Sequence, residues 1–91
     1  SGTQLRLSGN IDFGITSAVA SLLAAQPGLR SVVLDSPGGQ IYEGRGLAKL
    51  FIKKQLDTYV YSECSSACAT AFIGGMVRYL GPEGKLGSHQ Y

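Results

Sequence analysis

The 91-residue sequence has few charged residues and no cluster of them. Only 15% of its residues are charged, the net charge is +2, and no run of Lys or Arg occurs. Nucleic-acid-binding proteins gather basic residues on one face, so nucleic acid is a poor candidate partner. No apolar segment approaches the roughly 20 residues that a membrane-spanning helix needs. We therefore expect a soluble protein, and no membrane association is visible in this chain.

Cysteine and histidine are also scarce. Two cysteines, Cys64 and Cys68, and one histidine, His89, are too few for a zinc site, and the cysteine spacing is not the Cys-x-x-Cys of redox enzymes. We expect no metal and no cofactor. The cysteines are compatible with two buried thiols or with a local disulfide in an extracytoplasmic protein, which would order the short segment between them more than it would stabilise the fold.

The start of the chain lacks both Met and a charged-then-apolar signal sequence. Ser1-Gly2 indicates a processed or engineered start, so a leader or anchor could have been removed and the compartment cannot be read from a leader. The length and the hydrophobic fraction of 44% suit one globular domain covering residues 1–91.

Apolar periodicity predicts strands and helices in alternation. Residues 31–34 are apolar on both faces, which is typical of a strand covered on both sides in a parallel sheet. The alternation predicts an α/β fold with a largely parallel sheet. The predicted strands are residues 3–8, 31–34, 58–62, 77–80 and 85–88. The predicted helices are a helix capped by Asp12 and stopped by Pro27-Gly28, residues 41–54 and the uncharged run 64–73.

The turn Ser36-Pro37-Gly38-Gly39 leads from a predicted strand into a predicted helix. Pro37 fixes φ at the first corner, Gly38 can adopt positive φ, and Gly39 lets a bound group approach the backbone. The exposed N–H groups of such a turn can hold an anion, although Pro-Gly-Gly is more often a plain loop.

Two other segments, residues 63–68 and 87–90, also lie at the ends of predicted strands. The three segments can converge, because ligands of open α/β sheets bind at the carboxyl ends of the strands. Ser65 and Ser66 stand where a strand enters a helix, and the helix dipole there favours negative charge on an oxygen. A serine at this place is more often a simple cap. His89 is the candidate base, and it is otherwise an ordinary loop histidine.

Five short segments occur in a characteristic order: Leu34-Asp35-Ser36-Pro37-Gly38-Gly39, Cys64-Ser65-Ser66-Ala67-Cys68, Gly74-Gly75, Arg78 and Gly87-Ser88-His89-Gln90. In this order they resemble the signature of ClpP-like serine peptidases in the Clp protease/crotonase superfamily. The resemblance covers nearly the whole chain, and it is nearest to bacterial periplasmic ClpP-like proteins. It implies repeated β-α units in a single ClpP-like domain, 1–91, that is the N-terminal portion of the family fold and incomplete at its C-terminus.

The resemblance also implies roles for individual residues. Ser66, rather than Ser65, falls on the nucleophile and His89 on the base. The backbone N–H groups of Gly39 and Ala67 fall on the oxyanion hole. The implied activity is that of a serine endopeptidase with a peptide or protein substrate, no cofactor, and a periplasmic or other extracytoplasmic location.

Substrate contacts follow from the same resemblance. The backbone of Gly38, Gln40 and Ile41 would pair with an extended peptide. Core surface left uncovered by missing elements leads us to expect association into a homo-oligomer. The acid that completes the family's triad has no match among the aspartates, which are Asp12, Asp35 and Asp57.

The alternatives are a catalytically silent ClpP-like scaffold that binds peptides, a serine–lysine peptidase and a crotonase-type acyl-CoA enzyme. A cysteine paired with His89 is a weaker candidate for the nucleophile than Ser66, because neither cysteine falls on the nucleophile position of the family.

Overall fold

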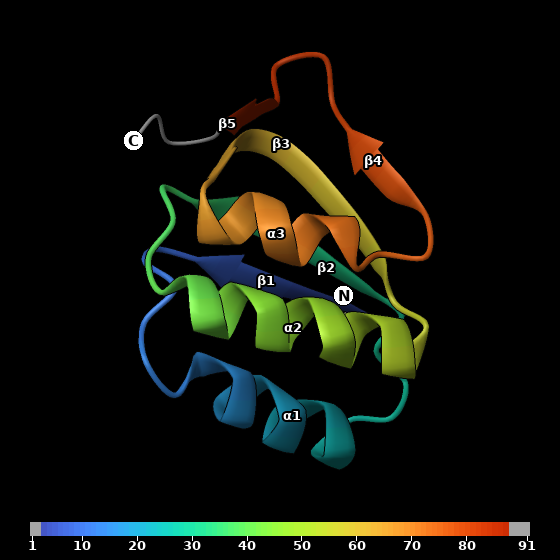
Figure 1. Cartoon of the computed structure of the whole chain (residues 1–91). Helices are drawn as coiled ribbons and strands as arrows, with labels where there is room; N and C mark the ends of the chain where they lie inside the picture. The colour runs from blue at the N-terminus through green and yellow to red at the C-terminus, as the bar shows by residue number, and fades with distance from the viewer. Residues whose placement is uncertain (1–2, 88–91) are drawn as a thin grey trace.

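Five strands and three helices make up the computed structural model, which describes residues 3–87 (Figure 1). They alternate along the chain as the sequence predicts, and the α/β class is confirmed. In order they are β1 (Gln4–Ser8), α1 (Ile15–Ala25), β2 (Ser31–Ser36), α2 (Ile41–Lys54), β3 (Asp57–Ser65), α3 (Ala67–Ile73), β4 (Arg78–Leu80) and β5 (Lys85–Gly87).

All pairings between the strands are parallel, in the order β1-β2-β3-β4, and β5 also pairs with β3. β4 lies beside Thr58–Val60 and β5 beside Glu63–Ser65, so the long strand β3 holds both short strands. Because the strands are parallel, the carboxyl ends of β2, β3 and β5 reach one edge of the sheet. This edge holds the turn 36–39, the junction 63–68 and Gly87, the described residue of the third segment singled out in the sequence.

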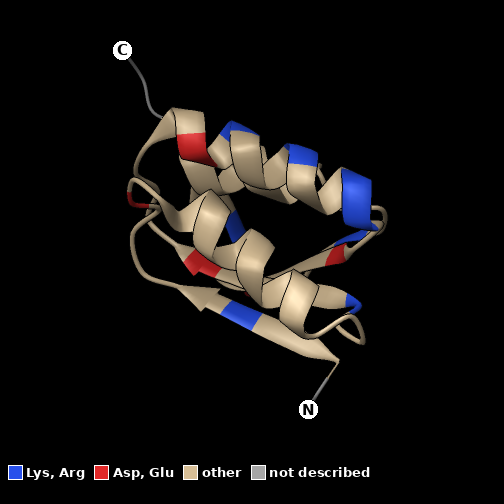
Figure 2. Ribbon diagram, turned by 90° about the horizontal axis from the view of Figure 1, so that it is seen from below, with Lys and Arg blue, Asp and Glu red and all other residues tan. Residues whose placement is uncertain are grey.

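The three helices cover one face of the sheet, with α2 between α1 and α3 (Figures 1 and 2). The core lies between this layer and the sheet. No helix within residues 3–87 combines the length and apolar character needed to cross a membrane. The buried core consists of Ile11, Val19, Leu23, Leu29, Val32, Leu34, Leu47, Phe51, Leu56, Val60, Cys64, Ala67, Cys68, Ala71 and Phe72.

Helix α2 is amphipathic. Leu47 and Phe51 are fully buried, whereas the Lys and Arg residues of the helix are exposed. Figure 2 shows the positions of Lys and Arg in blue. Lys53 and Lys54 lie in its last turn, where cations interact favourably with the helix dipole. The helix ends at a left-handed residue, Gln55, with φ of 57°.

Gly44 brings α2 and α3 into close contact. A Cβ on Gly44 would overlap the carbonyl oxygen of Ala67 and come within 3.0 Å of the Ala67 Cα. Alanine is favoured over glycine in a helix by about 1 kcal/mol. Here we expect the opposite sign: Gly44→Ala should lower the free energy of unfolding by about 1–3 kcal/mol, because overpacking displaces backbone.

Urea unfolding of Gly44→Ala measures this effect, with Gly28→Ala as the control, since nothing lies within 4 Å of a Cβ there. A Gly44→Ala protein as stable as the Gly28→Ala protein would contradict the close contact.

Two local predictions are wrong. The predicted helix 64–73 begins only at Ala67, because Cys64 is drawn into the sheet, where it pairs with Ser36 and with Leu86. Asp12 does not cap α1, because the N-cap is Gly14, which has no side chain that could bond to the first turn. A carboxylate from another helix takes the role of the cap, as described below.

Candidate active site

Ser66 is the single residue between the end of β3 and the start of α3. Its backbone has φ of 53° and ψ of −118°, a sparsely populated conformation that costs on the order of 1–3 kcal/mol. Its hydroxyl makes no capping hydrogen bond to α3, so the simple cap interpretation is not what the structure shows. A strained strand-to-helix turn of this kind presents the nucleophile in α/β hydrolases.

β3 reaches this turn through an irregularity. Leu34 pairs with Val60 and Ser36 with Cys64, so β3 has two more residues than β2 between the two pairs. After this shift β3 runs beside β5, and the N–H of Ser66 donates to the carbonyl of Gly87 at 2.9 Å. The segment that leads toward His89 is therefore anchored at Ser66. His89 itself lies outside the described residues, and its role stays a prediction.

The glycine turn lies directly against Ser66. Gly38 and Gly39 have φ of 117° and 152°, and the N–H of Gly38 donates to Ser36 Oγ at 3.0 Å. A Cβ built on Gly38 would lie 2.9 Å from Ser66 Cβ and 3.5 Å from Ser66 Oγ. The structure thus brings together the first two of the three segments that the sequence places at strand ends.

The direction of the Gly39 N–H follows from its neighbour. The carbonyl of Gly38 accepts a hydrogen bond from the N–H of Ile11 at 2.8 Å. In a trans peptide the carbonyl and the next N–H point in opposite directions, so the Gly39 N–H points away from Ile11. Among residues 3–87, no acceptor takes this N–H or that of Ala67, the first residue of α3.

A disulfide bond joins Cys64 and Cys68, whose Cα atoms are 5.0 Å apart. The two residues flank Ser66, and both are fully buried. The bond closes a short loop around the strained residue, so it restricts the backbone on both sides of Ser66.

The predicted peptide-pairing residues lie at the beginning of α2. Gln40 is exposed and Ile41, the first residue of α2, is half-buried. The N–H of Gln40 already donates to the carbonyl of Ile11 at 2.8 Å, so it is not free to bind a peptide. The N–H of Gly39 is the donor that this turn leaves open.

Neither Ile11 nor Glu43 was expected near the site from the sequence. Glu43 exposes only 5% of its surface. Its carboxylate accepts hydrogen bonds from the N–H groups of Gly14 and Thr16. The hydrogen bonds lower the pKa of Glu43 from its ordinary value, and the bond from Gly14 has the largest effect. No local pattern reveals these partners, which lie 27 and 29 positions away in the chain.

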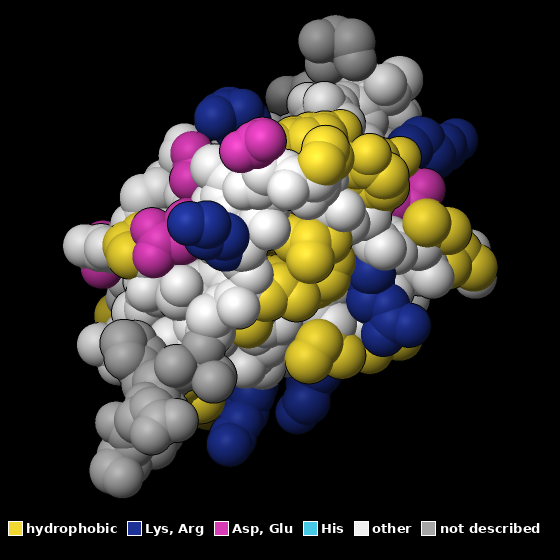
Figure 3. Space-filling model, turned by 90° about the horizontal axis from the view of Figure 1, so that it is seen from above, with side chains coloured by type: hydrophobic (Ala, Val, Ile, Leu, Met, Phe, Trp, Pro, Cys, Tyr) yellow, Lys and Arg dark blue, Asp and Glu magenta, His cyan; other side chains and the backbone are white. Residues whose placement is uncertain are grey.

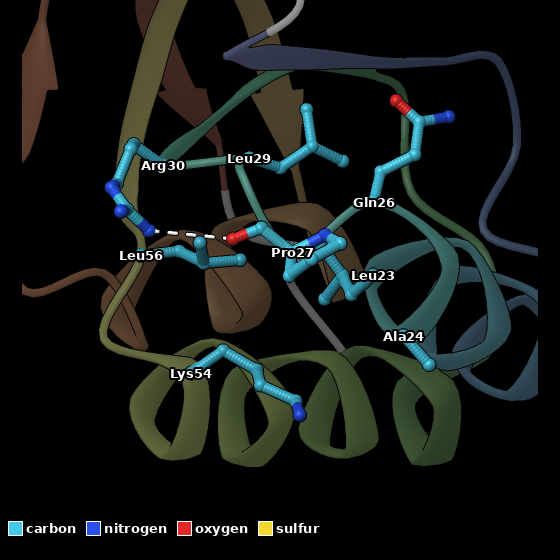
Figure 4. A pocket seen from close by; sticks show the side chains of 8 residues that line it. All are labelled: Leu23, Ala24, Gln26, Pro27, Leu29, Arg30, Lys54 and Leu56. Atoms are coloured by element: carbon cyan, nitrogen blue, oxygen red, sulfur yellow. Dashed lines mark hydrogen bonds between the residues drawn. The ribbon is translucent and has the colours of Figure 1, made fainter.

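Two hollows differ in their relation to this site. One of about 280 Å³ is lined by apolar residues together with Gln26, Arg30 and Lys54 (Figure 4). It lies at the opposite edge of the sheet, because Arg30 precedes β2. A broader hollow of about 640 Å³ is lined by residues of β3 and β5, among them Ser65 and Gly87, next to Ser66.

Comparison with known proteins gives matches only among solved structures. No model of a known protein family and no curated protein matches the chain. ClpP1 from Listeria monocytogenes, in an asparagine-to-aspartate mutant, has a TM-score of 0.84 and 16% identity over 99% of this chain and 57% of its own. The ClpP protease catalytic domain from Plasmodium falciparum has a TM-score of 0.82 and 21% identity, over 98% of this chain and 55% of its own.

These matches define the fold. The protein is an α/β protein with a parallel sheet, and it has the ClpP-like fold that the sequence predicts. The chain spans a little over half the length of each of these ClpP structures. These structures do not show whether the chain belongs to the periplasmic branch of ClpP-like proteins, so that branch stays a prediction.

Proposed function

We propose that the protein is a serine peptidase in which Ser66 is the nucleophile. The observation that carries this proposal is the strained turn at Ser66 beside two open N–H donors, those of Gly39 and Ala67. A structural serine needs neither the strain nor the donors. Ser65 does not share the arrangement, because its hydroxyl donates to Glu63 at 3.2 Å.

The proposed chemistry uses only groups of the protein and needs no cofactor. Ser66 Oγ attacks a peptide carbonyl while His89 accepts its proton, and the N–H groups of Gly39 and Ala67 bind the oxyanion. His89 then gives the proton to the leaving amine, and water hydrolyses the acyl-enzyme. Each oxyanion donor contributes roughly 3 kcal/mol of transition-state stabilisation in enzymes where one has been removed.

Covalent labelling by a fluorophosphonate tests the proposal. We expect the folded, full-length protein to be labelled, and the labelling to disappear in both Ser66→Ala and His89→Ala variants. Labelling that persists in His89→Ala would favour a serine–lysine peptidase. If the folded wild-type protein is not labelled, the remaining function is that of a catalytically silent scaffold that binds peptides.

We also propose an extracytoplasmic location. The supporting observation is the Cys64–Cys68 disulfide, because such bonds persist in oxidising compartments and are rare in the cytosol.

Self-association is the third part of the proposal, and the open face of the sheet supports it. Hydrophobic side chains gather on the side of the molecule formed by β3, β4 and β5 (Figure 3). Tyr59, Tyr61 and Tyr79, here called the tyrosine patch, have ring centroids 5.7–6.1 Å apart. Tyr61 and Tyr79 expose 48% and 45% of their surface. Exposed apolar patches are typical of surfaces that bind other proteins.

If copies associate through the tyrosine patch, the double variant Tyr61→Lys/Tyr79→Lys should shift the protein to monomer. A loss of about 3 kcal/mol of association energy, within the range for aromatic anchors, would weaken the dissociation constant by about two orders of magnitude. Sedimentation velocity over a concentration series measures it. Tyr42→Lys, at an exposed tyrosine on α2, is the control. Equal association of the two variants would contradict a role of the patch.

A further inference from the structure

Residues 11–16, which lead from the loop after β1 into the first turn of α1, lie along one side of the glycine turn, and we call them the strap. The N–H of Ile11 donates to Gly38 and the carbonyl of Ile11 accepts from Gln40, both at 2.8 Å. Gly39 lies between these two bonds, in a parallel bridge with Ile11. A Cβ on Gly39 would overlap the carbonyl oxygen of Ile11, so the two backbones are in direct contact. The strap therefore fixes both peptide planes next to Gly39.

Glu43 fixes the other end of the strap. Its Oε2 accepts from the N–H of Gly14 at 2.9 Å and its Oε1 from the N–H of Thr16 at 3.0 Å. The hydroxyl of Thr16 donates to the backbone carbonyl of Glu43, also at 3.0 Å. Each carboxylate oxygen thus faces an N–H at the beginning of α1, where the helix dipole also favours negative charge.

Glu43 and Gly39 belong to the same rigid unit. Glu43 lies in the first turn of α2, four residues after Gly39, and the N–H of Gly44 bonds back to the carbonyl of Gln40 at 3.0 Å. The strap is thus held at Ile11 by the turn and at Gly14 and Thr16 by Glu43. Two glycines have no side chains to set their own conformation, so these contacts must set it.

We propose that Glu43 is a positioning residue, which keeps the strap in place and thereby aims the N–H of Gly39 at the oxyanion. The proposal rests on the proposed function, because the oxyanion exists only if Ser66 attacks a carbonyl. Glu43 itself contacts neither the substrate nor Ser66 in the proposed arrangement. Its action passes through Ile11, whose bond to Gly38 sets the direction of the Gly39 N–H.

Glu43→Gln tests the proposal with a side chain of the same shape. The amide oxygen can accept one of the two N–H groups, but the amide NH₂ then opposes the other donor. In the full-length protein we expect the maximal rate constant of fluorophosphonate inactivation, kinact, to fall about tenfold, since small displacements of a catalytic group are costly. The inhibitor constant KI should stay within about twofold, because the reversible contacts of the inhibitor are intact.

Amide hydrogen exchange provides a readout on the strap itself. The N–H groups of Ile11 and Gln40 should exchange about tenfold faster in Glu43→Gln, whereas those of β2 should not change. Glu83→Gln, at an exposed glutamate, is the control for charge and should leave kinact and exchange as they are. Thr16→Val removes only the hydrogen bond from the Thr16 hydroxyl to Glu43 and should lower kinact about twofold to threefold. If Glu43→Gln does not fold, this variant tests the positioning role instead.

The outcomes separate the two proposals. If kinact is unchanged in Glu43→Gln, the positioning role is overturned; Thr16→Val decides this if only that variant folds. Labelling of the wild-type protein would still support the peptidase. A folded wild-type protein that is not labelled overturns the peptidase and, with it, the positioning role. Equal losses of kinact and of affinity for the inhibitor would show a general loss of the site's structure and overturn the positioning role as well.

Discussion

Replacing Ser66 by alanine should lower the rate of peptide hydrolysis by about three orders of magnitude or more, because the nucleophile of the proposed reaction is lost. Alanine retains Cβ and can pack against Gly38 as serine does, so the fold and the disulfide should persist. Release of fluorescent peptides from labelled casein by the full-length protein measures the rate, and circular dichroism verifies the fold.

Ser65→Ala is the matched control, one residue away. The Ser65 hydroxyl donates to Glu63 on the surface, and it lies in β3 instead of the strained turn. Ser65→Ala should change the free energy of unfolding by no more than about 0.5 kcal/mol, as surface changes usually do. Its activity should stay within about twofold, because the proposed reaction does not use this hydroxyl. A protein that needs Ser65 and tolerates Ser66→Ala would show that the nucleophile has been assigned to the wrong serine.

Gly39→Ala should have the second large effect, and it should act on both activity and stability. The Cβ would overlap the carbonyl oxygen of Ile11 and lie 2.8 Å from the Ile11 carbonyl carbon, at a residue with φ of 152°. The strap and the turn must then separate, which displaces the proposed oxyanion donor. We expect kcat to fall by about two orders of magnitude, as on losing one donor, and the free energy of unfolding to fall by about 1–3 kcal/mol.

Gly9→Ala separates the effect of backbone conformation from that of contact. Gly9 has φ of 91°, yet nothing lies within 4 Å of a Cβ there. Its replacement should cost about 1 kcal/mol of stability and leave kcat nearly unchanged. Casein hydrolysis and urea unfolding of both variants provide the comparison. Full activity of Gly39→Ala would remove Gly39 from the proposed oxyanion hole.

The elements that could be predicted from the sequence are those set by local pattern. The apolar run at Val32 and Leu34, the glycines after Pro37 and the amphipathic α2 all lie where periodicity and turn chemistry place them. A strand-to-helix junction within residues 63–68 is also predicted, where a β-branched and aromatic segment meets a run of small residues, although the helix begins at Ala67 and not at Cys64.

The rest depends on contacts between distant residues. Cys64 and Ser65 belong to β3 because Ser36 and β5 pair with them, which a run of small residues does not reveal. Asp12 satisfies the local rule for a helix cap, but the carboxylate that binds the first turn of α1 is Glu43, from α2. The conformation of Ser66 likewise follows from its bond to Gly87 and from the disulfide around it.

The location of a covalent adduct shows whether Ser66 is the nucleophile. The folded, full-length protein is treated with a fluorophosphonate, digested and examined by peptide mass spectrometry. We expect one adduct, on Ser66 in the disulfide-closed segment between Cys64 and Cys68. An adduct on Ser65 or another residue, or none on the folded protein, would contradict it.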